Sequence, residues 1–375
     1  MLDSNSPAAA RPVVPTPGKT ILSGSEVDTG VTAKAMLLGI DLGTSRSSIV
    51  SYSGTRKTVE TYVGFPKDAV SRKFLKQDVV FGKAALDNRL AVDLYRPLEK
   101  GVIKGSEEAN NDPTRRDKNL QAAKLLLKHL VDLASPGRDE MLFGVIGVPS
   151  LATQKNKQAI LEIARQVLDS VMIVSEPFTV AYGMERMADV LVIDIGAGTT
   201  DLCRMHGTVP VEEDEVSYTV AGDAVDQKLY DLIMARYPRA QITVNMCKSI
   251  KEQYGFVSDT KDRVTVTFPE DGKPTAHDVT DEVKHASEIL VAPIVEGIQK
   301  LVSTFNPEFQ ERLRHNVILS GGGGLMRGLN KRIEDAMKEY GGARVMVVDE
   351  PLYAGANGAL QLAIDMPGEY WQQLR

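Results

Sequence analysis

Two copies of one strand-and-turn pattern constrain the fold of this chain more than any other feature. Residues 191–201 read LVIDIGAGTTD, and residues 37–47 read LLGIDLGTSRS. In each copy an apolar strand ends in an aspartate, and a glycine and hydroxyl residues follow it. Glycine lets the backbone approach an anion closely, and the N–H groups of such a turn can bind phosphate. We therefore predict two related halves that hold one ligand, a nucleotide with its metal, between them.

Length and composition agree with this prediction. A chain of 375 residues exceeds what one hydrophobic core usually supports, so two domains are expected. The net charge of −6 indicates no basic surface, so we expect no nucleic-acid partner. The apolar runs have the length of strands and are broken by glycine, so no direct membrane insertion is expected. Cys203 and Cys247 are predicted to be small core residues of a cytoplasmic protein.

The first 34 residues differ from the rest of the chain. They are rich in proline, serine and threonine, and they are predicted to form a disordered tail, with a partner-binding arm as the alternative. We expect neither a secretory signal nor an amphipathic membrane-binding helix in this segment.

From residue 35 onward, predicted strands and helices alternate, which is typical of an α/β fold with largely parallel sheets. Strands are predicted at 35–43, 47–52, 141–149, 190–196, 200–205, 216–222, 264–268, 316–324 and 344–349. Helices are predicted at 120–133, 154–168, 226–237, 248–256, 281–305, 328–340 and 355–364. Pro293 is expected to kink or break the helix at 281–305.

The two turns supply most candidate site residues. The first contributes Asp41, which would hold a metal-bound water, and its phosphate contacts would be Gly43, Thr44 and Ser45. The second is richer, with Asp194, Gly196, Ala197, Gly198, Thr199 and Thr200. One Asp-x-Gly-Thr sequence alone also fits an ordinary tight hairpin, but two copies favour the functional interpretation.

Two further segments add candidates. SGGGGL at 320–325 follows a strand, and its four glycines leave bare backbone against which a base or ribose could lie. GANG at 355–358 opens the last helix and fits either a hinge or a plain loop. Glu176 stands beside Pro177 at a predicted helix start, where it would either stabilise the helix dipole or orient a water for attack on a γ-phosphate.

Taken together, the motifs resemble those of the actin superfamily. The segments 41–47 and 194–201 are similar to its two phosphate motifs, and 320–325 is similar to its adenosine motif. The connecting regions match 145–149 with 173–183, and 355–360. The resemblance implies an actin-like ATPase fold, in which two ribonuclease-H-like domains, each with a small inserted subdomain, flank a cleft for ATP and Mg²⁺.

The implied domain boundaries follow from the motif order. Domain I would comprise residues 35–178 and 346–375, with an inserted subdomain at about 58–105. Domain II would comprise 179–345, with an inserted subdomain at about 227–282.

Within the superfamily the bacterial MreB branch is most similar. Its signatures are RPLEKGVI at 96–103 and AGDAVD at 221–226. Still more similar is the group of magnetosome actins, through GFPKD at 64–68, VSEPFTVAYG at 174–183 and KEQYGFV at 251–257. That resemblance implies cytoplasmic, ATP-dependent homopolymer filaments that position magnetosomes, with magnetosome-associated adaptor proteins as partners.

The resemblance also implies roles for individual residues. Glu176 would orient the attacking water, and Asp41 and Asp194 would bind Mg²⁺ through water. Lys251 would contact the nucleotide, and the adenosine would lie on Gly322, Gly323, Gly324 and Leu325. MreB proteins usually have a nucleoside-facing Glu three residues before the Lys; this chain has Lys248 there, and Glu252 is a possible substitute.

Other functions remain open on the sequence alone. The alternatives are an MreB-like or plasmid-segregation filament, and a non-polymerising actin-fold nucleotide-binding protein or kinase. Phe65–Lys67 could be a filament contact or a simple turn. Tyr370 and Trp371 could dock against the first domain or contact a partner.

Overall fold

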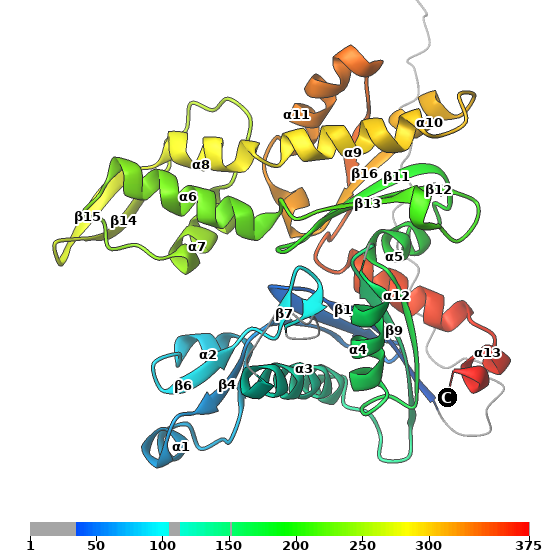
Figure 1. Ribbon diagram of the computed structural model, residues 1–375, viewed down its shortest axis with the longest axis horizontal. Coiled ribbons are helices and arrows are strands. Elements are labelled where there is room, and N and C mark those ends of the chain that lie inside the picture. Colours follow the sequence, from blue (N-terminus) through cyan, green and yellow to red (C-terminus); the bar gives the residue numbers. More distant parts are fainter. Residues whose placement is uncertain (1–34, 105–112, 151, 375) are drawn as a thin grey trace, which may run out of the picture.

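The computed structural model describes residues 35–104, 113–150 and 152–374 (Figure 1). The predicted tail, residues 1–34, lies outside this part of the chain. None of the helices in the described ranges is long and apolar enough to cross a membrane.

The first large sheet has the strand order β10-β9-β1-β2-β3. Its strands are β1 (Ala35–Leu42), β2 (Arg46–Ser51), β3 (Arg56–Glu60), β9 (Met141–Val148) and β10 (Ser170–Ser175). β1 runs parallel to β9 and antiparallel to β2. Helices cover both faces, and they are α3 (Pro113–Leu133), α4 (Gln154–Ala164), α12 (Ala354–Asp365) and α13 (Gly368–Gln373). Because both faces are buried, the strand residues of β1 are apolar almost throughout.

The second large sheet repeats this arrangement. Its order is β13-β12-β11-β16-β17. The strands are β11 (Ala188–Ile195), β12 (Thr200–His206), β13 (Glu215–Tyr218), β16 (Val317–Ser320) and β17 (Val345–Val347). One face packs against α6 (Gly222–Arg236), α8 (Thr280–Glu288), α9 (Val291–Ser303) and α11 (Leu329–Ala336), and the other against α5 (Glu176–Gly183). The internal repeat that the two turns predict is therefore present in the sheets.

The prediction of largely parallel sheets needs correction, because both sheets are mixed. In each sheet three strands pair in parallel, and two more are added, each antiparallel to the strand before it. The reason is the phosphate turn itself. A short turn joins β1 to β2 and β11 to β12 directly, and strands joined by so short a connection must run antiparallel.

Two small subdomains project from the same side of the molecule (Figure 1). The first contains a three-stranded sheet, β4 (Val63–Pro66), β5 (Val80–Phe81) and β6 (Val92–Tyr95), with α1 (Ala69–Leu75) and α2 (Gly82–Asp87). The second contains the hairpin of β14 (Thr265–Glu270) and β15 (Lys273–Asp278) and the helix α7 (Val244–Tyr254). Because β3 pairs with β2 in the large sheet, the first small sheet begins after Glu60, slightly later than expected.

The predicted helix at 281–305 is broken, as Pro293 indicated. It forms α8 and α9, which are separated at Ile289 and Leu290. Pro293 stands in the first turn of α9, where its missing N–H leaves no hydrogen bond of the helix unmade. Both cysteines are free and buried, which confirms their predicted place in the core. Burial raises the pKa of both thiols, that of Cys247 to about 12.

The C-terminal aromatic pair divides between core and surface. Trp371 is fully buried in α13 and stacks on Phe143 of β9, with ring centroids 5.1 Å apart. Its neighbour Tyr370 is 56 % exposed. The structure therefore confirms docking against the first large sheet for Trp371, and it leaves the Tyr370 ring at the surface.

Helices α5 and α12 cross in direct backbone contact. A Cβ atom added at Gly358 of α12 would lie 1.7 Å from the carbonyl oxygen of Thr179. One added at Gly183 of α5 would lie 2.7 Å from the Cα atom of Gly358. α12 also approaches β1 closely, since a Cβ at Gly39 would lie 2.1 Å from the Ala356 carbonyl oxygen. Glycines therefore set the distance between the helix that begins with Glu176 and the first large sheet.

We predict that Gly358→Ala destabilises the protein. The new methyl group cannot share space with a carbonyl oxygen, so α12 must move away from α5, at a cost of about 2 kcal/mol or more in the free energy of unfolding. Urea unfolding followed by circular dichroism measures this loss. Gly137→Ala is the matched control, because its Cβ would meet only the flexible Glu140 side chain. Equal stability of the two variants would contradict the proposed backbone contact.

Candidate functional site

One cleft gathers most of the residues predicted from the sequence. It has a volume of about 370 Å³ and lies where both phosphate turns, the start of α5 and the glycine segment after β16 converge. The predicted residues that line it are Asp41, Gly43, Thr44, Ser45, Glu176, Asp194, Gly196, Ala197, Gly198, Thr199, Lys251, Gly322, Gly323 and Leu325. Segments more than 280 positions apart in the sequence thus line one cleft.

Two predicted residues are not among those that line the cleft. The hydroxyl of Thr200 donates to the Val220 carbonyl oxygen at 2.8 Å, behind the turn. Thr200 is the first residue of β12 and is fully buried, and this hydrogen bond holds its side chain away from the cleft. Gly324 is buried, and the place of its missing Cβ faces Leu319 at 3.5 Å. For these two residues the placement argues against the predicted ligand contact.

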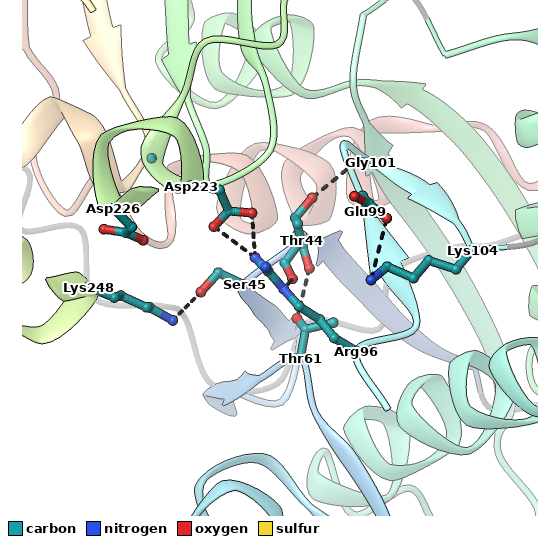
Figure 2. Close-up of polar contacts among 12 residues, drawn as sticks. Thr44, Ser45, Thr61, Arg96, Glu99, Gly101, Lys104, Asp223, Asp226 and Lys248 are labelled. Carbon is teal, nitrogen blue, oxygen red and sulfur yellow. Dashed lines mark hydrogen bonds and ion pairs between the residues drawn. The ribbon is translucent and has the colours of Figure 1, made fainter. Parts of the chain in front are cut away.

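A third segment, residues 96–103, contacts both phosphate turns. The Gly101 N–H donates to the Thr44 hydroxyl oxygen at 3.1 Å (Figure 2). A Cβ atom at Gly198, in the second turn, would lie 2.6 Å from both that hydroxyl oxygen and the Cα atom of Lys100. The RPLEKGVI segment therefore lies between the turns, and Gly198 must lack a side chain for them to meet.

Three carboxylates stand at the inner end of the cleft. Asp41 and Asp194 each stand one residue before the end of their strands, β1 and β11, and Glu176 opens α5. Asp194 and Glu176 are each 9 % exposed. Burial raises the pKa of Asp41 to about 7, and burial followed by repulsion from neighbouring carboxylates raises the pKa values of Glu176 and Asp194. Gly321 makes room for this group, since a Cβ there would lie 2.2 Å from an Asp194 carboxylate oxygen.

The carboxylates fit a bound cation held through water. Buried like charges are costly unless a cation compensates them, and Mg²⁺ commonly keeps several waters beside carboxylates and phosphates. Within the described part of the chain no three His, Cys, Asp or Glu side chains are close enough to hold a metal directly. Water-mediated binding of Mg²⁺ by Asp41 and Asp194 stays a prediction.

Ion pairs that the sequence did not predict cross the cleft. Arg96, which follows β6, donates to both carboxylate oxygens of Asp223 in α6, at 2.8 and 3.0 Å (Figure 2). It also donates to the Thr44 carbonyl oxygen at 2.8 Å. Arg46 of β2 pairs with Glu252 of α7 at 2.8 Å. Arg96 and Asp223 both belong to segments singled out for their family resemblance, but nothing in the sequence indicated that the two would meet.

Comparison with known proteins identifies the family. A family model described as MreB/Mbl protein matches residues 35–367. The chain belongs to the MreB/Mbl family of actin-like proteins. It is 39 % identical over 345 residues to the actin-like protein MamK of Paramagnetospirillum magneticum, which covers 92 % of this chain and 97 % of that relative. The resemblance inferred from the motifs is thereby confirmed.

Solved structures confirm the actin-like fold. The structure of the MamK double helical filament matches with a TM-score of 0.84 at 37 % identity, covering 89 % of this chain and 100 % of that one. A non-polymerising MamK mutant bound to AMPPNP matches with a TM-score of 0.67, also at 37 % identity, covering 88 % of this chain and 99 % of that one. Both matched structures cover nearly the whole of their own chains, so the likeness extends over the full actin-like fold.

The buried carboxylates predict how stability depends on pH. The Asp41 carboxyl has a pKa of about 7 in the folded chain and of about 4 when unfolded. Between these values the folded state keeps a proton that the unfolded state has lost, so the free energy of unfolding falls as pH rises from about 4 to 7.

Asp41→Asn should flatten that decline. In chelator and without nucleotide, we expect the variant to exceed the wild type in free energy of unfolding by about 1 kcal/mol or more at pH 8. Urea unfolding at a series of pH values measures both slopes. Asp139→Asn, at an exposed position, is the control. An unchanged slope in Asp41→Asn would show that this carboxyl is not the group responsible.

Proposed function

We propose that this protein is an ATPase that assembles into cytoplasmic filaments and organises magnetosomes into a chain. The observation that carries the proposal is the meeting of two glycine turns above three buried carboxylates. Backbone N–H groups suit phosphate oxygens, and grouped carboxylates suit a hydrated dication. ATP with Mg²⁺ combines both requirements, and the AMPPNP in the related MamK mutant structure supports the same ligand.

The turns would bind and orient the phosphates. Gly43 and Gly196 leave the backbone accessible, and the hydroxyls of Thr44, Ser45 and Thr199 line the same cleft. These groups donate hydrogen bonds, which are strongest toward charged oxygens. The bare backbone at Gly322 and Gly323 would support the adenosine.

The three carboxylates would bind the metal ion and activate the attacking water. Mg²⁺, when bound with the nucleotide, supplies positive charge that offsets the phosphate charge. Asp41 and Asp194 would hold it through water. Glu176 would orient a water and accept its proton, and burial raises the pKa of its carboxyl, which makes the carboxylate a stronger base.

The related proteins support the proposal that this chain forms filaments. The likeness of this chain to the MamK double helical filament supports self-association. ATP binding would favour subunit contacts, and hydrolysis would loosen them. Adaptor proteins on magnetosomes would then link the filament to its cargo.

Electron microscopy of the purified full chain with ATP and Mg²⁺ tests this function. We expect filaments with ATP and none in chelator without nucleotide. Monomers that consume ATP only after an acceptor is added would instead indicate a kinase. If the protein forms filaments but its genome lacks genes for iron-crystal organelles, an MreB-like or plasmid-segregation role is indicated.

Glu176→Gln separates hydrolysis from assembly. Because it removes the base but keeps the size of the side chain, we expect phosphate release to fall about 100-fold or more while filaments form and persist. Phosphate release and light scattering are measured together. Glu212→Gln, at an exposed position, is the matched control. Hydrolysis by Glu176→Gln at the normal rate would exclude the proposed role of Glu176.

A further inference from the structure

Lys248 is an unexpected residue at the cleft, and its surroundings are unusual. It projects from α7, its side chain is 18 % exposed, and it lines the cleft. Its Nζ atom donates to the Ser45 hydroxyl oxygen at 2.5 Å (Figure 2). Ser45 belongs to the first phosphate turn, so this ammonium group reaches the anion-binding end of the cleft from the opposite wall.

The other cations of the cleft already have partners. Lys251 lies 2.7 Å from an Asp226 carboxylate oxygen and donates to the Gly222 carbonyl oxygen at 2.8 Å. Arg46 is paired with Glu252 at 2.8 Å. Arg327 donates to the Tyr254 carbonyl oxygen. The charge of Lys251, the lysine predicted to contact the nucleotide, is therefore largely compensated within α6 and α7.

Lys248 lacks such compensation. Within the described residues, the one carboxylate oxygen within 4.0 Å of its Nζ atom is Glu252 Oε1, at 4.0 Å, and the other oxygen of Glu252 binds Arg46. Burial, together with the nearby cations Arg46 and Arg96, lowers the pKa of Lys248 although Glu252 opposes the change. A half-buried ammonium group whose close partner is a neutral hydroxyl gains most from an anion placed beside that hydroxyl.

We propose that Lys248 binds the phosphate chain of the nucleotide, and that it does so in place of a contact to the ribose. The inference rests on the proposed ATP site and adds a residue to it. A phosphate oxygen held by the first turn would accept from Lys248 where Ser45 accepts now. The Ser45 hydroxyl would then be free to donate to the same phosphate chain. Lys248 thereby makes the cleft selective for charged nucleotides over the uncharged nucleoside.

The test compares ligands that differ in phosphate. ATP, ADP and adenosine are titrated into nucleotide-free protein by calorimetry, at concentrations where light scattering detects no polymer. We expect Lys248→Gln to weaken ATP and ADP binding about tenfold or more and to leave adenosine binding unchanged. Lys248→Arg keeps the charge and should retain most of the affinity. Lys228→Gln, exposed on the neighbouring α6, is the matched control.

The outcomes are distinguishable. Unchanged binding of ATP and ADP by Lys248→Gln would overturn the inference while leaving the proposed function intact. An equal loss for adenosine would also overturn it, because the side chain would then serve the nucleoside or the fold. Wild-type protein that binds none of the three ligands would overturn the proposed function together with this inference.

Discussion

The burial of Asp41, Asp194 and Glu176 beside one another is the constraint on which the architecture depends. Like charges brought out of water repel and cost free energy, so the folded chain gains from a cation in the cleft. The repeated strand-and-turn pattern supplies one aspartate from each sheet. The third carboxylate comes from α5, which packs on the second sheet. A ligand that compensates all three therefore joins both halves.

Contacts across the cleft extend this coupling beyond the inner end. The Arg96–Asp223 pair and the Arg46–Glu252 pair link the first half of the chain to α6 and α7. Arg96 also binds the Thr44 carbonyl oxygen, so the same side chain contacts both a phosphate turn and the opposite wall. Such partly exposed pairs each contribute little stability in water, but together they favour one relative placement of the walls.

The sequence predicted those features that depend on residues close together in the chain. Backbone preferences of nearby residues explain the two turns and the helix break at Pro293. They also explain why Asp41 and Asp194 stand near the ends of their strands. Contacts such as those of Arg96 with Asp223 and of Lys248 with Ser45 join positions far apart in the chain, which periodicity cannot connect. The orientation of Thr200 was missed because a run of hydroxyl residues does not reveal which of them face the ligand. The sheets were expected to be largely parallel because strands and helices alternate along the chain. The short turns after β1 and β11, which require antiparallel neighbours, were not taken into account in that prediction.

The glycine crossing of α5 and α12 has a mechanical consequence. α5 packs on the second sheet and α12 on the first, and Gly183 and Gly358 let their backbones touch where they cross. Without interlocking side chains at that point, the two helices resist rotation about the contact less than they resist separation. The small subdomains lie far from the crossing (Figure 1). A rotation about this crossing would therefore displace the small subdomains further than the residues at the crossing itself.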